Sequence, residues 1–165
     1  MSDATPPKLA AGSLVLCYFP EEQAPFDVGP KARPALVLRV FRRTSDDSRW
    51  VEVAYASTQR TSANGAALKP HEFEIDPSAN PASHLTQTTR FDLERRTALP
   101  WNDTWFKAPG AERSLRPFGQ ISDADLARAK ALAASFPSRQ LSFNEKASQT
   151  PASSMTTAQE PGQST

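Results

Sequence analysis

The sequence predicts a mainly β protein, a small antiparallel barrel with one α-helix near its C-terminal end. The 165 residues include 15 prolines, which interrupt the backbone often and favour short strands over long helices. Short apolar runs alternate with segments of turn-forming residues along much of the chain. Only one segment, 122–135, has the three-and-four spacing of an amphipathic helix.

Several short segments have the composition of β-strands. Residues 13–19 are apolar on both faces, which is typical of a central strand. The turn 44–48 (TSDDS) separates two further apolar runs, so these should pair as an antiparallel hairpin. In a later strand, Phe73 and Ile75 should face inward and the neighbouring acids outward. The expected strands are 13–19, 35–43, 50–56, 71–76 and one within 85–96.

The expected helix begins at Ser122, whose hydroxyl can cap it. Asp123 and Asp125 follow in the first turn, where carboxylates suit the helix dipole. We expect an apolar stripe on this helix to pack on the sheet, giving an SH3-like barrel with an added helix. The stripe consists of Leu126, Ala129, Leu132, Ala133 and Phe136.

One folded domain is expected at 12–136, between a flexible N-terminus at 1–11 and a disordered tail at 137–165. Both ends are polar, contain proline and have few large apolar residues, so they bury little surface. Residues 97–117 have no clear period, and no element is predicted there.

The composition favours a cytoplasmic protein without a metal centre. Cys17 lies in an apolar run and has no second cysteine for a disulfide or zinc site, so we expect a buried, inert thiol. No apolar stretch approaches the roughly 20 residues that span a bilayer, and no secretory signal precedes the first strand. His71 and His84 lie in loop or edge contexts and are expected at the surface.

Arginines concentrate in the central third of the chain, although the net charge is only +1. They can form a solvated strand edge or a surface that binds phosphate and base edges, for which arginine is well suited. The set consists of Arg39, Arg42, Arg43, Arg49 and Arg60.

Four motifs, in this order and spacing, resemble the PemK/MazF toxins of type II toxin–antitoxin systems. They are GSLV at 12–15, RPALVL at 33–38, ASTQ at 56–59 and GQISDADL at 119–126. The resemblance covers roughly 12–136 and implies a PemK/MazF/CcdB-type barrel. It also implies a bacterial cytoplasmic, growth-inhibiting homodimer that cleaves single-stranded RNA without a metal or other cofactor and is neutralised by a cognate antitoxin.

The resemblance also implies the site residues. Arg33 matches the family's catalytic arginine before the proline, and Ser57 matches a hydroxyl residue at the end of a later strand, where threonine is usual. Arg90 and Asp92 match an Arg-x-Asp element on a further strand. Candidate RNA-binding residues are Thr58, Gln59, Phe26 on the long loop 21–31, and Trp101.

The four catalytic candidates suit cleavage by the RNA's own 2′-hydroxyl. Asp92 can take the hydroxyl proton, and Arg33 or Arg90 can hold the charge that grows on the phosphate. Ser57 or Thr58 would donate a hydrogen bond to that phosphate. Each residue also has a structural alternative. Arg90 and Asp92 can form a same-face salt bridge, and Arg33 and Ser57 can simply begin and end strands.

Two tryptophans also have a functional and a structural interpretation. Trp101 and Trp105 can stack on splayed bases or pack in the core or a dimer interface, and packing is favoured. A second hypothesis for the whole chain keeps the fold without the cleavage, as a gyrase-poison-like toxin or a protein-binding module. It is motivated by serine at Ser57, the low net charge and the acidic first loop.

Overall fold

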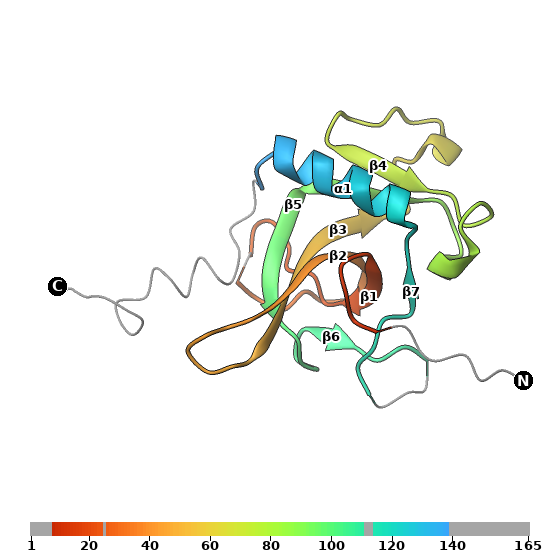
Figure 1. The fold of residues 1–165 in the computed structure, drawn as a ribbon. Coiled ribbons are helices and arrows are strands. Elements are labelled where there is room, and N and C mark those ends of the chain that lie inside the picture. Colours follow the sequence, from red (N-terminus) through yellow and green to blue (C-terminus); the bar gives the residue numbers. More distant parts are fainter. Residues whose placement is uncertain (1–7, 25, 111–113, 139–165) are drawn as a thin grey trace, which may run out of the picture.

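The computed structural model describes residues 8–24, 26–110 and 114–138 and has a mainly β architecture with one C-terminal helix (Figure 1). The strands are β1 (Ser13–Cys17), β2 (Arg33–Arg42), β3 (Arg49–Ser57), β4 (Glu72–Ile75), β5 (Thr89–Pro100), β6 (Phe106–Lys107) and β7 (Gly119–Gln120). Two 3₁₀ turns, η1 (Ser62–Asn64) and η2 (Pro81–Ser83), flank β4, and the helix is α1 (Asp123–Ser135).

The strands form one antiparallel sheet that curls into a half-barrel. Its order is β4-β5-β3-β2-β1-β6, and β7 pairs with β1 beside β6. The three long strands β2, β3 and β5 bend across the molecule, and α1 lies over one side of the curl (Figure 1). Mainly β content and a C-terminal helix are as the sequence predicts.

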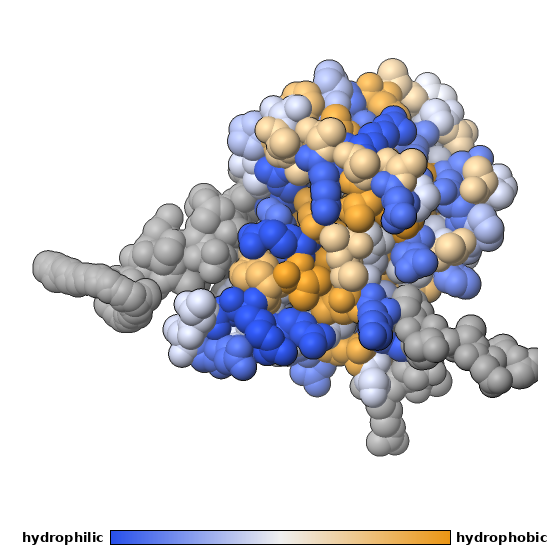
Figure 2. Space-filling view, viewed as in Figure 1, coloured by the Kyte–Doolittle hydropathy of each residue, from blue (hydrophilic) through white to orange (hydrophobic). Residues whose placement is uncertain are grey.

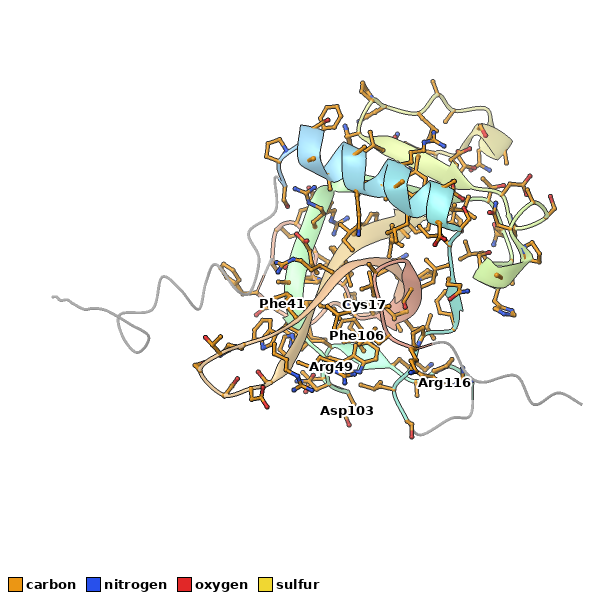
Figure 3. All side chains as sticks on the ribbon, viewed as in Figure 1. Cys17, Phe41, Arg49, Asp103, Phe106 and Arg116 are labelled. Atoms are coloured by element: carbon orange, nitrogen blue, oxygen red, sulfur yellow. The ribbon has the colours of Figure 1, made fainter. Side chains whose placement is uncertain are left out.

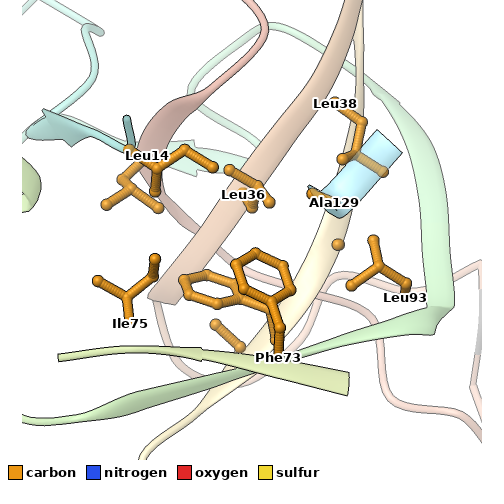
Figure 4. Packing of buried hydrophobic residues seen from close by; sticks show 11 residues of the cluster. Leu14, Leu36, Leu38, Phe73, Ile75, Leu93 and Ala129 are labelled. Carbon is orange, nitrogen blue, oxygen red and sulfur yellow. The ribbon is translucent and has the colours of Figure 1, made fainter. Parts of the chain in front are cut away.

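Each face of the sheet has its own apolar core, because side chains alternate along every strand. The face beneath α1 is built around stacked Phe73 and Phe91, whose ring centroids lie 5.2 Å apart (Figure 4). The other face buries Val51, Val53 and Leu99 with their neighbours from β1 and β2.

The first strand contributes to both cores, as expected of a strand that is apolar on both faces, and it pairs with β2 on one side and with the two-residue β6 and β7 on the other. Leu14 belongs to the helix-side core, whereas Val15 and Cys17 belong to the other. The strand ends at Cys17 rather than Phe19, and the next residue, Tyr18, donates its N–H to the Trp105 carbonyl. Cys17 is fully buried, and burial raises the pKa of its thiol, so the group stays protonated and unreactive.

The predicted hairpin and helix are confirmed. Strands β2 and β3 pair antiparallel along their length, with one register shift between Val37 and Arg39. Ser122 caps α1 by accepting the N–H of Asp125 at 3.1 Å. The expected apolar stripe packs on the sheet through buried Ala129 and half-buried Leu126.

Three expectations need correction. The acids of 71–76 do not all face solvent: Glu72 is buried, because Arg90 and Arg60 neutralise it. His71 is half-buried rather than exposed, whereas His84 is exposed as expected. Within 97–117, where no element was predicted, β5 continues to Pro100 and β6 forms.

Most of the two predicted flexible ends, 1–7 and 139–165, lies outside the described residues. Across the described ranges, no helix is long and apolar enough to cross a membrane.

Candidate active site

Three of the catalytic candidates form a row across the sheet where β2 begins and β3 ends. Ser57 pairs with Arg90 in the β3–β5 ladder. In the neighbouring ladder Ala35 pairs with Tyr55, so the antiparallel register places Arg33 level with Ser57. The β2–β3 hairpin and the more distant β5 therefore place Arg33, Ser57 and Arg90 side by side.

The fourth candidate, Asp92, lies in the next row. It pairs with Tyr55 on one side and with Glu72 on the other. Because side chains alternate along a strand, Arg90 and Asp92 share a face, opposite the buried Phe91. This face also carries Tyr55, and all four candidates therefore point to the same side of the sheet.

Arg90 is held in a buried ion-pair network. Its Nη1 donates to Glu72 Oε2 at 2.8 Å, and its Nε donates to the carbonyl of Gln59 at 3.1 Å. Arg60 Nη2 reaches the same Glu72 oxygen at 3.1 Å from the outside. The Arg90 and Glu72 side chains are 7% and 1% exposed, but that of Arg60 is 48% exposed. Arg90 thus ties β5 to β4 and to the end of β3.

The ionisation of Glu72 couples this network to pH. Burial opposes the charge, but the N–H of Lys69 and the guanidiniums of Arg90 and Arg60 outweigh it, so the pKa of Glu72 lies below its ordinary value. A carboxyl whose pKa is lower in the folded chain stabilises the fold above its unfolded pKa of 4.5, and this stability is lost as pH falls through the folded pKa.

We therefore predict that the free energy of unfolding declines below about pH 4.5 and that Glu72 causes part of the decline. Urea unfolding over a pH series would measure it in wild type and in Glu72→Gln, which cannot ionise. The variant should be less stable at neutral pH and show a shallower acid slope. Equal acid slopes in the two proteins would contradict a role for Glu72.

Asp92 and His71 form a second polar contact beside this network. Asp92 Oδ1 accepts the N–H of Glu94 at 3.0 Å and lies 3.4 Å from His71 Nε2. His71 Nδ1 lies 3.6 Å from Glu94 Oε1, and its ring packs edge-on against Phe136 at 5.9 Å. The histidine therefore joins two carboxylates of β5 and is fixed by the residue after α1.

Three side chains at this place could supply ligand atoms to a cation. Atoms of His71, Glu72 and Asp92 lie within 4.8 Å of one another, the one such group within the described ranges. Glu72 already binds two guanidiniums, so an incoming metal would compete with Arg90 and Arg60. This competition favours arginine rather than a metal as the source of positive charge.

A small cleft opens beside Arg33. Its volume is about 200 Å³, and the loop after β1 walls it with Glu21, Glu22 and Gln23. Arg33 is exposed at its edge, while Arg95 lies 3.9 Å over the Tyr55 ring and donates to the Pro20 carbonyl at 3.1 Å. The cleft therefore has two guanidiniums, one exposed and one fixed.

The comparisons with known proteins do not supply a family. No protein-family model matches the chain, and no curated protein matches it significantly. Its function must therefore be argued from the residues and their arrangement.

The RNA-binding candidates lie in three places. Thr58 and Gln59 are exposed directly after β3, and the Gln59 N–H donates to Ser57 Oγ at 3.0 Å. Phe26 is half-buried in the loop between β1 and β2. Trp101 lies beyond the other end of β5, packed on Phe106 with ring centroids 4.7 Å apart, so the structure does not bring it to the row.

Four residues near the row were missed as site candidates: Tyr55, His71, Glu72 and Arg95. Glu72 and His71 looked like an exposed strand edge, since the arginine that buries Glu72 is 18 residues away. The β3–β5 register shifts after Ala54, and this shift brings Arg95 onto Tyr55. The sequence alone showed only that Tyr55 and Ser57, two residues apart, share one face of their strand.

Proposed function

We propose that the chain is an endoribonuclease that cuts single-stranded RNA, the toxin of a type II toxin–antitoxin system with a PemK/MazF-type, SH3-like barrel. The observation that supports this most is the convergence of Arg33, Ser57, Arg90 and Asp92, from three strands, on one face beside an open cleft. The proposal includes a homodimer and a cognate antitoxin that covers this face.

The proposed reaction uses the RNA's own 2′-hydroxyl. Asp92 takes the hydroxyl proton, the oxygen attacks phosphorus, and the bond from phosphorus to the 5′-oxygen breaks to leave a 2′,3′-cyclic phosphate. His71, 3.4 Å from Asp92, is placed to exchange that proton and return it toward the leaving oxygen.

The guanidiniums and hydroxyl act on the phosphate. Arg33 is exposed and can hold two phosphate oxygens, with a benefit that increases as negative charge grows. Ser57 can donate a hydrogen bond from the neighbouring position. Arg90 is buried and paired with Glu72. Its role is therefore to hold the neighbouring strands in position, and Arg33 is the arginine that contacts the phosphate.

The test is cleavage of mixed-sequence single-stranded RNA by purified protein in EDTA. We expect fragments that end in cyclic phosphate or 3′-phosphate, and no cleavage of RNA with 2′-O-methyl groups. Asp92→Asn and Asp92→Ala should lose activity, with circular dichroism to show that they fold. Wild type that leaves varied RNAs intact, or Asp92 variants with wild-type rates, would contradict the proposal.

A specific observation also favours the non-catalytic alternative. Counted as whole residues, Asp92 is only 4% exposed and Arg90 5%, and such buried, paired groups often serve the fold alone. Expression in bacteria separates the possibilities. Growth arrest with loss of messenger RNA favours cleavage, arrest with DNA damage and intact messenger RNA favours a gyrase-poison-like toxin, and no arrest favours a protein-binding module.

A further inference from the structure

A second positively charged cavity lies at the opposite end of β2 and β3, next to their hairpin. Its volume is about 570 Å³, within the range of about 300–1,000 Å³ typical of ligand pockets. Among the described residues, four cationic side chains line it and no carboxylate does. The cations are Lys8, Arg42, Arg49 and Arg116.

Two of these arginines face each other directly. Arg42 and Arg49 are cross-strand partners at the last pair of the hairpin ladder. Like charges in that position destabilise a sheet. Arg42 is partly compensated by Asp47 at 3.7 Å, with both side chains mostly exposed. Arg49 forms no ion pair with any residue in the described ranges, so an anionic ligand would relieve the repulsion.

The cavity also has a rigid aromatic wall. Trp101 lines it and is supported from behind by Phe106, with ring centroids 4.7 Å apart. In the view of Figure 3, Arg49, Arg116 and Phe106 all lie in the lower part of the molecule, and Asp103, which is labelled there too, does not line the cavity. Because packing on Phe106 already restricts the Trp101 side chain, stacking on a planar group costs little further conformational entropy.

Arginine and aromatic groups also pack together in the next pair of the hairpin ladder, Phe41 with Trp50, whose side chains point to the other face from Arg42 and Arg49. Arg39 lies 4.3 Å over the Phe41 ring, and Arg43 lies 4.3 Å over Trp50. In the same view, Figure 2 shows hydrophilic and hydrophobic residues side by side over the lower part of the molecule. Trp50 is only 1% exposed, so these contacts hold the hairpin in shape, and Trp101 is the aromatic residue that the cavity offers to a ligand.

We infer that this cavity binds single-stranded RNA, with phosphates at Arg42 and Arg49 and a base stacked on Trp101. An acidic peptide would satisfy the arginines but has no base to place against the indole, so the combination favours a single-stranded nucleic acid, of which RNA is the one tested below. We name the cavity, with these three residues, the hairpin site.

The hairpin site is distinct from the candidate active site. The two lie at opposite ends of the 10-residue β2, from Arg33 to Arg42, which is a span of roughly 30 Å at about 3.3 Å per residue. That distance exceeds one nucleotide, so the hairpin site would engage a different part of the strand. The inference concerns binding alone and does not rest on the proposed cleavage.

The experiment measures binding of a fluorescent 2′-O-methyl RNA of about ten nucleotides to the full chain over a salt series. This RNA cannot be cleaved by 2′-hydroxyl attack, so failure of the proposed function leaves the result unaffected. The variants are Arg42→Gln/Arg49→Gln and Trp101→Leu. Arg128→Gln removes one positive charge elsewhere, at an exposed residue of α1 whose guanidinium lies 5.5 Å over the Phe73 ring, and is the control.

The double arginine variant should lower the slope of log affinity against log salt by about 1.4, since each phosphate contact on a single strand contributes about 0.7. Trp101→Leu should weaken binding by at least about fivefold without changing that slope, as expected for loss of base stacking. Arg128→Gln should bind as wild type does.

Three outcomes would overturn the inference. One is an unchanged salt slope in the double arginine variant, whose exposed side chains carry little risk to folding. Another is equal weakening by Arg128→Gln, which would indicate general charge attraction. The third is equal binding of an oligoglutamate peptide with the same loss in the arginine variants and no effect of Trp101→Leu, which would identify an acidic-peptide site.

Discussion

Arg90→Ala should lower the free energy of unfolding by about 3–5 kcal/mol, the usual cost of leaving one member of a buried ion pair without its partner. The Glu72 side chain is 1% exposed and receives Arg90 Nη1 at 2.8 Å, so the variant leaves a carboxylate with little access to water. The loss of Arg90 also removes the bond from its Nε to the Gln59 carbonyl, which holds the end of β3. Urea unfolding at neutral pH measures the effect.

Arg60→Ala is the matched control for that variant. Arg60 binds the same Glu72 oxygen at 3.1 Å, but its side chain is 48% exposed. Exposed ion pairs contribute about 0–1 kcal/mol, so Arg60→Ala should be nearly as stable as wild type. If the two alanine variants lost equal stability, the burial of the Arg90–Glu72 pair would not be what stabilises this end of the sheet.

Arg33→Ala should reduce kcat/KM for RNA cleavage by about 10²–10³, the effect of removing one donor that stabilises a developing oxyanion. Arg33 is exposed at the start of β2 and lines the cleft, so its loss should leave the fold intact. This separates it from Arg90 and Asp92, whose burial mixes chemistry with stability. The prediction rests on the proposed cleavage, and single-turnover cleavage with thermal unfolding measures both properties.

Two further variants define the role of Arg33. Arg33→Lys keeps the charge but lacks the planar fork, so it should recover only part of the activity. Lys31→Ala removes an exposed charge two residues earlier, outside the cleft lining, and should cleave as wild type does. Wild-type activity in Arg33→Ala would exclude this arginine from the reaction, whatever the remaining residues do.

Local structure was predicted well where adjacent residues decide it. The hairpin at 44–48 and the cap at Ser122 depend on residues within a few positions of one another. The shared face of Arg90 and Asp92 follows from the period of a strand. In contrast, no element could be predicted within 97–117. The strand β6 in this segment has two residues, too few for a pattern, and it forms by pairing with β1.

The sequence by itself determined which side chains share a face on each strand, because backbone sterics fix that alternation. Only the tertiary structure decided which faces meet. Pairing of β5 with both β3 and β4 buries Glu72 against Arg90, and the register shift brings Arg95 onto Tyr55. These contacts depend on chain segments many residues apart, whose free energy is gained only when the whole sheet assembles.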